Sequence, residues 1–328
     1  EATPVAEPRE AAQEAAAPET ADPMAAALAA AEEKPLIGII QYVAHPALDA
    51  ARDGFLDGLK ELGYEDGVNI TVDTRNANAS PDILSSIADH FIGESATLVL
   101  AIATPAAQTL AGKTETIPIL GTAITDYVAA KLAASNEEPG YNVSGTTDMN
   151  PIKEQIDLIR RMAPDAKTVG LLYTSNEDNS ILQARQAREY IEAAGLVYEE
   201  VTVNNSNDVQ QAAQSLVERC DVIYVPTDNV VASSMSIVHE IAVARKMPIF
   251  CGEAGQILGG GTATLGISYY NLGKQTAQMA VDVLKGADIS KMPIQAQSEF
   301  EYTINKTMCD LIGLEIPADL LPFAIEVP

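Results

Sequence analysis

The feature that most constrains this chain is an alternation of strand-like and helix-like segments that occurs twice. Each copy begins with a short apolar run, continues with apolar residues at helical spacing, and then repeats strand, helix and strand. Gly63 follows Gly38 by 25 positions, and in the second copy Gly195 follows Gly170 by the same interval. Such alternation predicts a parallel sheet with helices on both faces. The predicted fold class is therefore α/β, with two doubly wound parallel-sheet lobes built from copies of one unit.

The last part of the chain does not fit a simple division into two consecutive domains. Residues 271–286 have the apolar spacing of one more amphipathic helix, and residues 298–314 have the pattern of one more strand and a short helix. If each sheet takes one of these additions, the chain crosses between the lobes three times. We therefore expect an amino-terminal lobe made of residues 35–145 plus 268–292 and a carboxy-terminal lobe made of residues 146–267 plus 293–328.

Residues 1–34 differ in composition from everything that follows. They consist mainly of Ala, Glu and Pro, with almost no large apolar side chain. Such a segment cannot bury enough surface to offset the entropy of ordering it. We expect a disordered tether, which is compatible with a processed leader or anchor upstream and equally with a plain flexible end.

Charge and cysteine content narrow the classes of partner. The formal net charge of −26, without a cluster of Lys or Arg, argues against nucleic acid as a partner. Cys220, Cys251 and Cys309 are odd in number and form no CxxC motif, so we expect buried thiols. The histidines have no ligand spacing, and we expect no metal site. No apolar run approaches the roughly eighteen residues of a membrane span.

Polar residues stand where the predicted strands end, which is where open parallel sheets bind ligands. Thr104 and Pro105 follow the buried run LVLAIA, so Thr104 is predicted to cap a helix whose free N–H groups attract an anion. Asp228 follows the strand-like run VIYVP in the other lobe. A carboxylate that faces an anion seat across a cleft would suit a ligand with both an ammonium and a carboxylate, such as an amino acid. Plain helix capping is the competing interpretation of each residue.

Other strand ends also carry polar side chains. Each alone is more typical of a solvated loop, but together they occupy every strand end that would line the cleft. These further candidate ligand-binding residues are Gln41, Tyr42, His45, Thr125, Asp126, Glu177, Asn179, Ser180, Thr227, Asn229 and Glu253.

Motifs of common enzyme classes are missing from the sequence. The turn after the first strand is QYVAHPALDA, not GxGxxG, and no GxSxG elbow occurs. The segment GISYYNLGKQT has six residues between its glycines where a P-loop has four, and Gln275 stands where Ser or Thr would hold magnesium. We expect a binding protein without enzymatic activity and without a cofactor.

Several unbroken blocks, in order, resemble the ABC-transporter substrate-binding proteins of the tryptophan/tyrosine-type group. The blocks are GIIQYVAHPALDAARDGFLDGL, AIATPAAQ, AITD, NDVQQAAQSLVERCDVIYVPTDN and LGISYYNLGKQTAQMAVDVLKG. The resemblance covers residues 36–314. It implies a type I periplasmic-binding fold, with three crossovers and a ligand enclosed between two lobes. It also implies a periplasmic or lipid-anchored protein outside the cytoplasm, with a membrane permease and an ATPase as partners. Contact with the membrane would be made only through the anchor, and we expect a monomer.

The resemblance also implies roles for individual residues. Thr104 and Thr125 match the partners of a ligand carboxylate, and Asp228 matches the partner of the ammonium. The polar loop of the second lobe corresponds to Glu177, Asn179 and Ser180. This loop reads TSNEDNS, and Tyr127 stands where many members have Pro, so the two departures affect the side-chain pocket.

The ligand is expected to be an L-aromatic amino acid. Tyr42 and His45 near the first seat, with a polar loop opposite, suit a flat or amphipathic side chain, and the resemblance implies the same. A branched aliphatic amino acid is the alternative ligand. The alternative function is a ligand-sensing domain of the same fold, which would need a helix-turn-helix ahead of residue 36; the Ala/Glu/Pro segment does not have that pattern.

Overall fold

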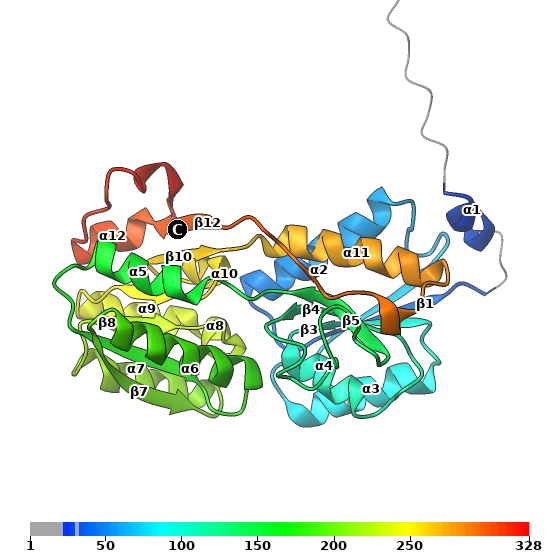
Figure 1. The fold of residues 1–328 in the computed structure, drawn as a ribbon, viewed down its shortest axis with the longest axis horizontal. Helices are drawn as coiled ribbons and strands as arrows, with labels where there is room; N and C mark the ends of the chain where they lie inside the picture. Colours follow the sequence, from blue (N-terminus) through cyan, green and yellow to red (C-terminus); the bar gives the residue numbers. More distant parts are fainter. Residues whose placement is uncertain (1–21, 30–32, 328) are drawn as a thin grey trace, which may run out of the picture.

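The structure, a computed structural model, describes residues 22–29 and 33–327, and these residues form two lobes placed side by side (Figure 1). Each lobe has its own sheet and its own apolar core. In the described part of the chain, no helix has both the length and the apolar character needed to span a bilayer.

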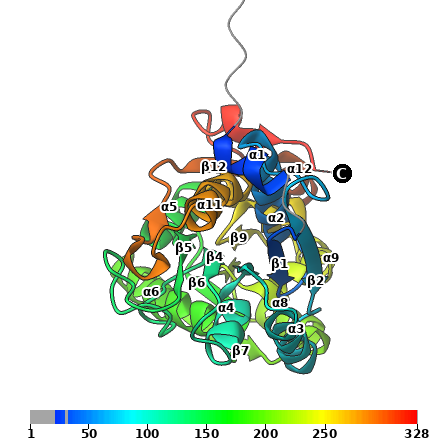
Figure 2. The ribbon, with the colours of Figure 1, turned by 90° about the vertical axis from the view of Figure 1, so that its right-hand side faces the viewer.

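The amino-terminal lobe contains a six-stranded parallel sheet in the order β11-β5-β4-β3-β1-β2. Its strands are β1 (Leu36–Gln41), β2 (Thr71–Asn76), β3 (Leu98–Ile102), β4 (Ile119–Ile124), β5 (Val143–Thr147) and β11 (Gln295–Ala296). Its helices are α2 (Pro46–Glu61), α3 (Pro81–Gly93), α4 (Thr104–Ala111) and α11 (Tyr269–Leu284), with the 3-10 turn η2 (Ile289–Lys291). Figures 1 and 2 show α2 and α11 together on one face of the sheet, and α3 and α4 on the other.

The carboxy-terminal lobe contains a seven-stranded sheet in the order β13-β12-β10-β9-β8-β6-β7. Its strands are β6 (Thr168–Thr174), β7 (Val197–Val203), β8 (Val222–Val225), β9 (Ile249–Cys251), β10 (Ala263–Gly266), β12 (Glu301–Asn305) and β13 (Ala324–Ile325). Its helices are α5 (Ile152–Met162), α6 (Asp178–Ala193), α7 (Val209–Val217), α8 (Asn229–Ser233), α9 (Met235–Ala244), α10 (Ala254–Leu258) and α12 (Lys306–Ile312), with 3-10 turns η1 (Ser206–Asp208) and η3 (Leu321–Phe323). All pairs are parallel except β10 with β12, because β12 enters this sheet directly from the other lobe.

The two sheets repeat one strand order, which confirms the duplicated α/β unit. The order β2-β1-β3-β4-β5 in the first lobe corresponds to β7-β6-β8-β9-β10 in the second. The repeated glycines have the same local roles in both lobes. Gly38 and Gly170 lie in β1 and β6, where a Cβ would press on a neighbouring side chain. Gly63 and Gly195 have φ values of 88° and 74°, which a residue with a Cβ rarely adopts.

Three crossovers join the lobes. They run between β5 and α5, between β10 and α11, and between β11 and β12. The second crossover brings α11 back onto α2, and the two helices approach closely because each presents a glycine to the other. A Cβ at Gly54 would lie 2.0 Å from the backbone oxygen of Tyr270, and a Cβ at Gly273 would lie 2.0 Å from that of Ala51.

A short helix, α1 (Pro23–Ala29), differs from the disorder expected for residues 1–34. Asp22 accepts a hydrogen bond from the Met24 N–H and forms an ion pair of 2.5 Å with Lys285. The Ala25 side chain is buried, and its carbonyl accepts a bond from Asn69 Nδ2. The composition argument considered only large apolar side chains, whereas polar contacts fix this helix. The rest of the predicted tether, residues 1–21 and 30–32, lies outside the described residues.

Candidate functional site

A small cavity lies between the lobes, beside the carboxyl ends of their strands. Its free volume in this structure is about 10 Å³. This is far below the range of about 300–1,000 Å³ that is typical of small-molecule pockets, so the lobes must separate or the lining side chains must move to admit a ligand. The lining residues come from both lobes and from the crossovers: His45, Leu48, Ala123, Thr125, Asp148, Asn179, Thr227, Asp228, Asn229, Glu253 and Tyr269.

Direct hydrogen bonds connect the lobes around this cavity. Gln183 Nε2 donates to Thr125 Oγ1 at 3.0 Å, and the same Gln183 accepts from the Thr227 N–H. His45 Nε2 and Asn229 Oδ1 are 3.3 Å apart. The Gln183–Thr125 and His45–Asn229 contacts exist only while the lobes are together, so the structure is a closed state.

Apart from Asp148, the residues that the amino-terminal lobe contributes to the cavity are uncharged. Burial lowers the pKa of His45 to about 4, so its imidazole is neutral at physiological pH. Leu48 from α2 and Ala123 from β4 add apolar surface. Ala123 has a φ of 56°, at an irregularity in the pairing of β4 with β5. Left-handed backbone at a non-glycine residue is uncommon and concentrates at binding sites.

The start of α4 differs in detail from the prediction. The cap is Ala103, with a φ of 83°, and Thr104 and Pro105 are the first two residues of the helix. Thr104 is therefore not the cap. Its Oγ1 is buried without a hydrogen-bond partner. A hydroxyl beside the free N–H groups of a helix start still has the character of an anion seat.

The carboxy-terminal wall carries carboxyl groups. Behind this wall, Glu177 stands at the N-cap position of α6 without a capping bond, and its Oε2 accepts from Asn229 Nδ2 at 2.5 Å and from Asn179 Nδ2 at 3.2 Å. Burial, with a further contribution from the charge of Asp228, raises the pKa of Glu177 to about 8. Glu253 caps α10 through a bond from the Gly255 N–H, and burial raises its pKa to about 8 as well. These carboxyls bind protons readily in the closed state.

Asp228 is held mainly by its own lobe. It caps α8 by accepting from the Val231 N–H at 2.8 Å. It also accepts from the Thr174 N–H at 2.6 Å and from Thr174 Oγ1 at 2.8 Å. Burial raises its pKa. Capping, the competing interpretation from the sequence, is thus a role that this residue does have.

Two lining residues that the sequence analysis missed come from the crossovers. Asp148 follows β5, and Tyr269 begins α11 after β10. Tyr269 Oη donates to Asp148 Oδ2 at 2.6 Å. Beside them, Asn150 Oδ1 accepts from the Ile267 N–H at 3.1 Å, so the first two crossovers are bonded to one another. Leu48 and Ala123 were also missed, because apolar residues carry no signal at a strand end.

Of the predicted residues, His45, Thr125, Asn179, Thr227, Asp228, Asn229 and Glu253 meet at the cavity. The others do not line it: Gln41, Tyr42, Thr104, Pro105, Asp126, Glu177 and Ser180. Gln41 braces its own lobe by donating to the Val43 carbonyl and to Asp49. Asp126 accepts from the backbone N–H groups of Val128 and Ala129, and so caps a turn.

The remaining predicted residues lie close behind the cavity wall. Tyr42 is buried, and the charges of Glu177 and Asp228 add to the effect of burial in raising its pKa, so it lies near both carboxyls. The Ser180 hydroxyl is buried and accepts from Asn179 Nδ2 at 3.3 Å.

Buried polar atoms without a partner gather around the cavity. They are His45 Nδ1, Thr104 Oγ1, Asp148 Oδ1, Glu177 Oε1, Asn179 Oδ1, Thr227 Oγ1 and Glu253 Oε1. Buried polar groups in proteins are nearly always hydrogen-bonded, and each that is not costs about 1–3 kcal/mol. Such a concentration in one place points to a polar ligand.

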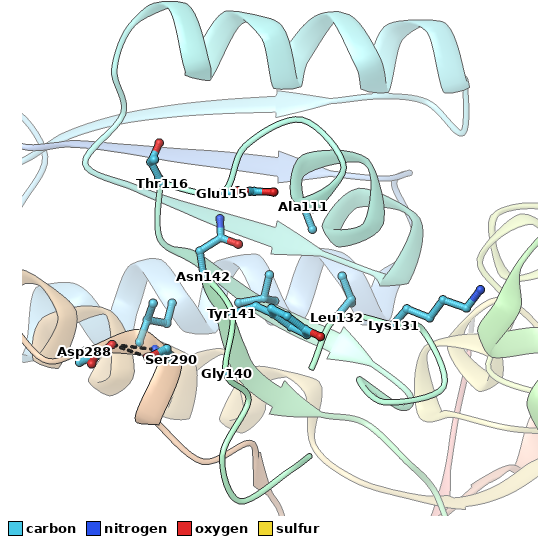
Figure 3. A pocket seen from close by; sticks show the side chains of 12 residues that line it. Ala111, Glu115, Thr116, Lys131, Leu132, Gly140, Tyr141, Asn142, Asp288 and Ser290 are labelled. Carbon is cyan, nitrogen blue, oxygen red and sulfur yellow. Dashed lines mark hydrogen bonds between the residues drawn. The ribbon is translucent and has the colours of Figure 1, made fainter. Parts of the chain in front are cut away.

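A larger pocket lies on the surface of the amino-terminal lobe, away from this cluster (Figure 3). Its volume is about 710 Å³, and it is bordered by Ala111, Lys131, Tyr141 and Ser290, among others. None of its lining residues contributes an unpartnered buried polar atom among the described residues. Size alone therefore does not make it the functional site.

Comparison with known proteins agrees with this geometry. Residues 36–328 match the family model of the ABC transporter substrate binding proteins. The chain belongs to this family. As a substrate-binding protein of an ABC transporter, it is extracytoplasmic, and the alternative of a separate ligand sensor is not supported. The fold is that of the type I periplasmic-binding proteins, as predicted.

A tyrosine-binding protein of Clostridioides difficile is 40% identical over 279 residues, which are 85% of this chain and 81% of the relative. A solved domain from Streptococcus pneumonia in complex with L-Trp is 35% identical with a TM-score of 0.86, covering 89% of this chain and all of that one. A ligand-free, open substrate-binding protein with adhesive properties from Clostridium difficile is 40% identical, but its TM-score is only 0.68, with 90% and 100% covered. The chain thus superposes better on the L-Trp complex than on the open structure, although the latter is more similar in sequence.

Proposed function

We propose that this substrate-binding protein captures an L-aromatic amino acid between its lobes and delivers it to an ABC importer. The observation that carries the proposal is the cluster of unpartnered buried polar atoms that both lobes present around the small cavity between them. A zwitterion satisfies donors and acceptors together. The tyrosine and tryptophan named for the two relatives support an aromatic side chain.

The two lobes would hold opposite ends of the ligand. The ligand carboxylate would bind near the start of α4, where Thr104 Oγ1 lacks a partner, and near Thr125. The ammonium would bind among the carboxyl groups of the other lobe, where the resemblance places Asp228. The ring would lie against the uncharged wall formed by Leu48 and Ala123. An aromatic ring buries much area there and keeps a polar handle for a hydrogen bond.

The same proposal covers the partners. Ligand binding shifts the population toward the closed state. The closed state would present the surface that a cognate permease recognises, and an ATPase would drive transport. The chain would act as a monomer without catalysing a reaction. It would lie free in the periplasm or be held at the membrane by a lipid anchor on its amino-terminal tether.

A thermal-shift screen over the twenty amino acids tests this function. A ligand present at a hundredfold excess over its Kd stabilises the native state by about 2.7 kcal/mol. We expect L-tryptophan, L-tyrosine or L-phenylalanine to raise the melting temperature most, with their D-enantiomers as controls. Stabilisation by leucine, isoleucine or valine without any effect of the aromatic amino acids would instead assign a branched aliphatic ligand.

A further inference from the structure

We infer that the ligand's ammonium group binds between Asp148 and Glu253, and that Tyr269 positions Asp148 for this contact. The inference rests on the proposed function in one respect, namely that the ligand is an α-amino acid. It assigns the cationic end of that ligand to a residue of the first crossover and to a helix cap of the carboxy-terminal lobe, in place of Asp228.

The carboxylates differ in how many of their oxygens are free to accept a hydrogen bond. Asp228 Oδ1 already accepts from Thr174 Oγ1 and the Val231 N–H, and its Oδ2 accepts from the Thr174 N–H. Asp148 Oδ1 and Glu253 Oε1 are buried, belong to residues that line the cavity, and accept no hydrogen bond. An ammonium group is a donor of three hydrogen bonds, so it favours oxygens that are free to accept them.

The two carboxyls also lack a counterion. Asp148 and Glu253 are each 1% exposed and line the same small cavity, and the charge of Asp148 contributes to the raised pKa of Glu253. No Lys or Arg is among the residues that line the cavity. Two buried carboxyls without a counterion repel one another, and one ammonium placed between them removes the repulsion and satisfies both free oxygens.

The two carboxyls are attached to different lobes. The Asp148 N–H donates to the carbonyl of Ile124 at 3.1 Å, which fixes Asp148 to β4 of the amino-terminal lobe. Glu253 is fixed to α10 of the other lobe as its cap. A ligand ammonium bound to both therefore links the two lobes directly. Tyr269, whose hydroxyl bonds to Asp148 Oδ2, leaves Oδ1 free to accept a further hydrogen bond.

Calorimetric titration with matched ligands tests this seat. The probes are L-tryptophan and indole-3-propionate, which lacks the ammonium, with L-leucine and 4-methylpentanoate as a second pair. We expect Asp148→Asn and Glu253→Gln each to weaken binding of the amino acid about 30-fold or more, since removing one partner of a buried charge contact costs about 2–5 kcal/mol. Binding of the des-amino acid should be unchanged or tighter. Asp126→Asn, which changes a carboxyl outside the cavity, should alter neither.

Tyr269→Phe tests the positioning role. It should weaken binding of the amino acid less than Asp148→Asn does. It should also make the affinity fall at a higher pH on acidification, because the Tyr269 hydrogen bond favours the ionised form of Asp148. A merely structural role would change the affinity without moving this pH dependence.

The outcomes separate the two proposals. One outcome is that neither L-tryptophan nor indole-3-propionate binds, while the variants weaken binding of L-leucine more than binding of 4-methylpentanoate. In that case the aromatic ligand is wrong, but the assignment of the ammonium to Asp148 and Glu253 is supported. If Asp148→Asn and Glu253→Gln weaken amino acid and des-amino acid equally, or weaken neither, the seat is wrong. Should a variant fail to fold, the native protein decides: it must bind L-tryptophan far more tightly than indole-3-propionate, and equal affinities overturn the seat.

Discussion

The two lobes share one strand order, yet their equivalent strand ends carry opposite chemistry. After the first strand of the unit stand His45 in one lobe and Glu177 in the other. After the third stand Thr104 and Asp228, and after the fourth Thr125 and Glu253. Each amino-terminal member is uncharged, with His45 kept neutral by a pKa of about 4, and each carboxy-terminal member is an acid.

This contrast shows that the duplicated unit supplies geometry, while the strand-end residues supply polarity. A parallel sheet brings the same strand ends to the cleft from both sides whatever side chains they carry. Because these strand ends differ, we expect a bound zwitterion to have one favourable orientation, with its carboxylate toward Thr104 and Thr125 and its ammonium toward Asp148 and Glu253. The fifth strand ends carry Asp148 and Tyr269, which bond to one another at 2.6 Å.

The largest difference between the lobes should appear in stability, at the ends of the third strands. Asp228→Ala removes a helix cap and leaves three buried donor bonds of Thr174 and Val231 without an acceptor. We expect the free energy of unfolding to fall by about 3 kcal/mol or more in urea titrations. Asp126→Ala, the control, removes a partly exposed turn cap and should cost about 1 kcal/mol. Equal losses would show that the buried network of Asp228 is not stabilising.

Thr104→Val should have the opposite pattern. The Thr104 hydroxyl has no partner in the protein, so its removal should leave the unfolding free energy of the ligand-free protein unchanged or slightly higher. Binding of the aromatic amino acid should weaken by about 1.5–3 kcal/mol, the value of a hydrogen bond to a charged group. Unchanged affinity in calorimetry would remove Thr104 from the carboxylate seat.

The hydrogen bonds between the lobes should also affect the ligand affinity. Gln183 bonds both lobes, to Thr125 and to the Thr227 N–H, inside the closed cleft. Gln183→Ala should reduce ligand affinity about 5- to 10-fold, because a typical hydrogen bond contributes about 0.5–1.5 kcal/mol to the closed state. Gln108→Ala removes an exposed bond to Asp178 at 2.8 Å and should change affinity less than twofold. A larger loss of affinity in Gln108→Ala than in Gln183→Ala would contradict a role of Gln183 in stabilising the closed state.

The smallest signal is a pH dependence of closure without ligand. Glu177 and Glu253 are buried in the closed structure, and burial raises the pKa of each to about 8. We expect opening of the cleft to hydrate them, and exposed glutamates ionise near about pH 4.3. Closure therefore takes up protons, and its free energy becomes less favourable as the pH rises from about 4.5 to about 8. The radius of gyration of the ligand-free protein, from X-ray scattering, should be smaller at pH 5 than at pH 8.

The double variant Glu177→Gln, Glu253→Gln provides the control for this effect. It should lose most of the change in radius, whereas the general repulsion of an acidic protein would persist in it. An undiminished change in the double variant would assign the pH dependence to net charge instead of to the cleft.

Much of the fold could be predicted from the sequence, because the periodicity of apolar residues and the spacing of the glycines depend on local structure. The strand-end rule also found His45, Asp228 and Glu253, since parallel strands bring their ends together. It also selected Gln41 and Asp126, which do not line the cavity, because a polar residue at a strand end can equally bond within its own lobe.

What the sequence could not supply was contact between distant segments. Asp148 and Tyr269 are 121 positions apart and meet only because two crossovers run side by side. The left-handed backbone of Ala103, which shifts the start of α4 by one residue, likewise depends on the tertiary setting, since alanine itself disfavours it. Helix α1 is held by single contacts to Asn69 and Lys285, which composition does not reveal.

The central claim, that the cleft encloses an L-aromatic amino acid, can be tested with the ligand's own fluorescence. The chain contains no Trp, so added L-tryptophan is the only indole in the sample. We predict a saturable shift of its emission to shorter wavelength at one ligand per chain, because the ring passes from water into the dry cavity, and competition by L-tyrosine. Emission and melting temperature that stay unchanged with tryptophan, tyrosine and phenylalanine, while leucine or another solute stabilises the protein, would contradict the claim.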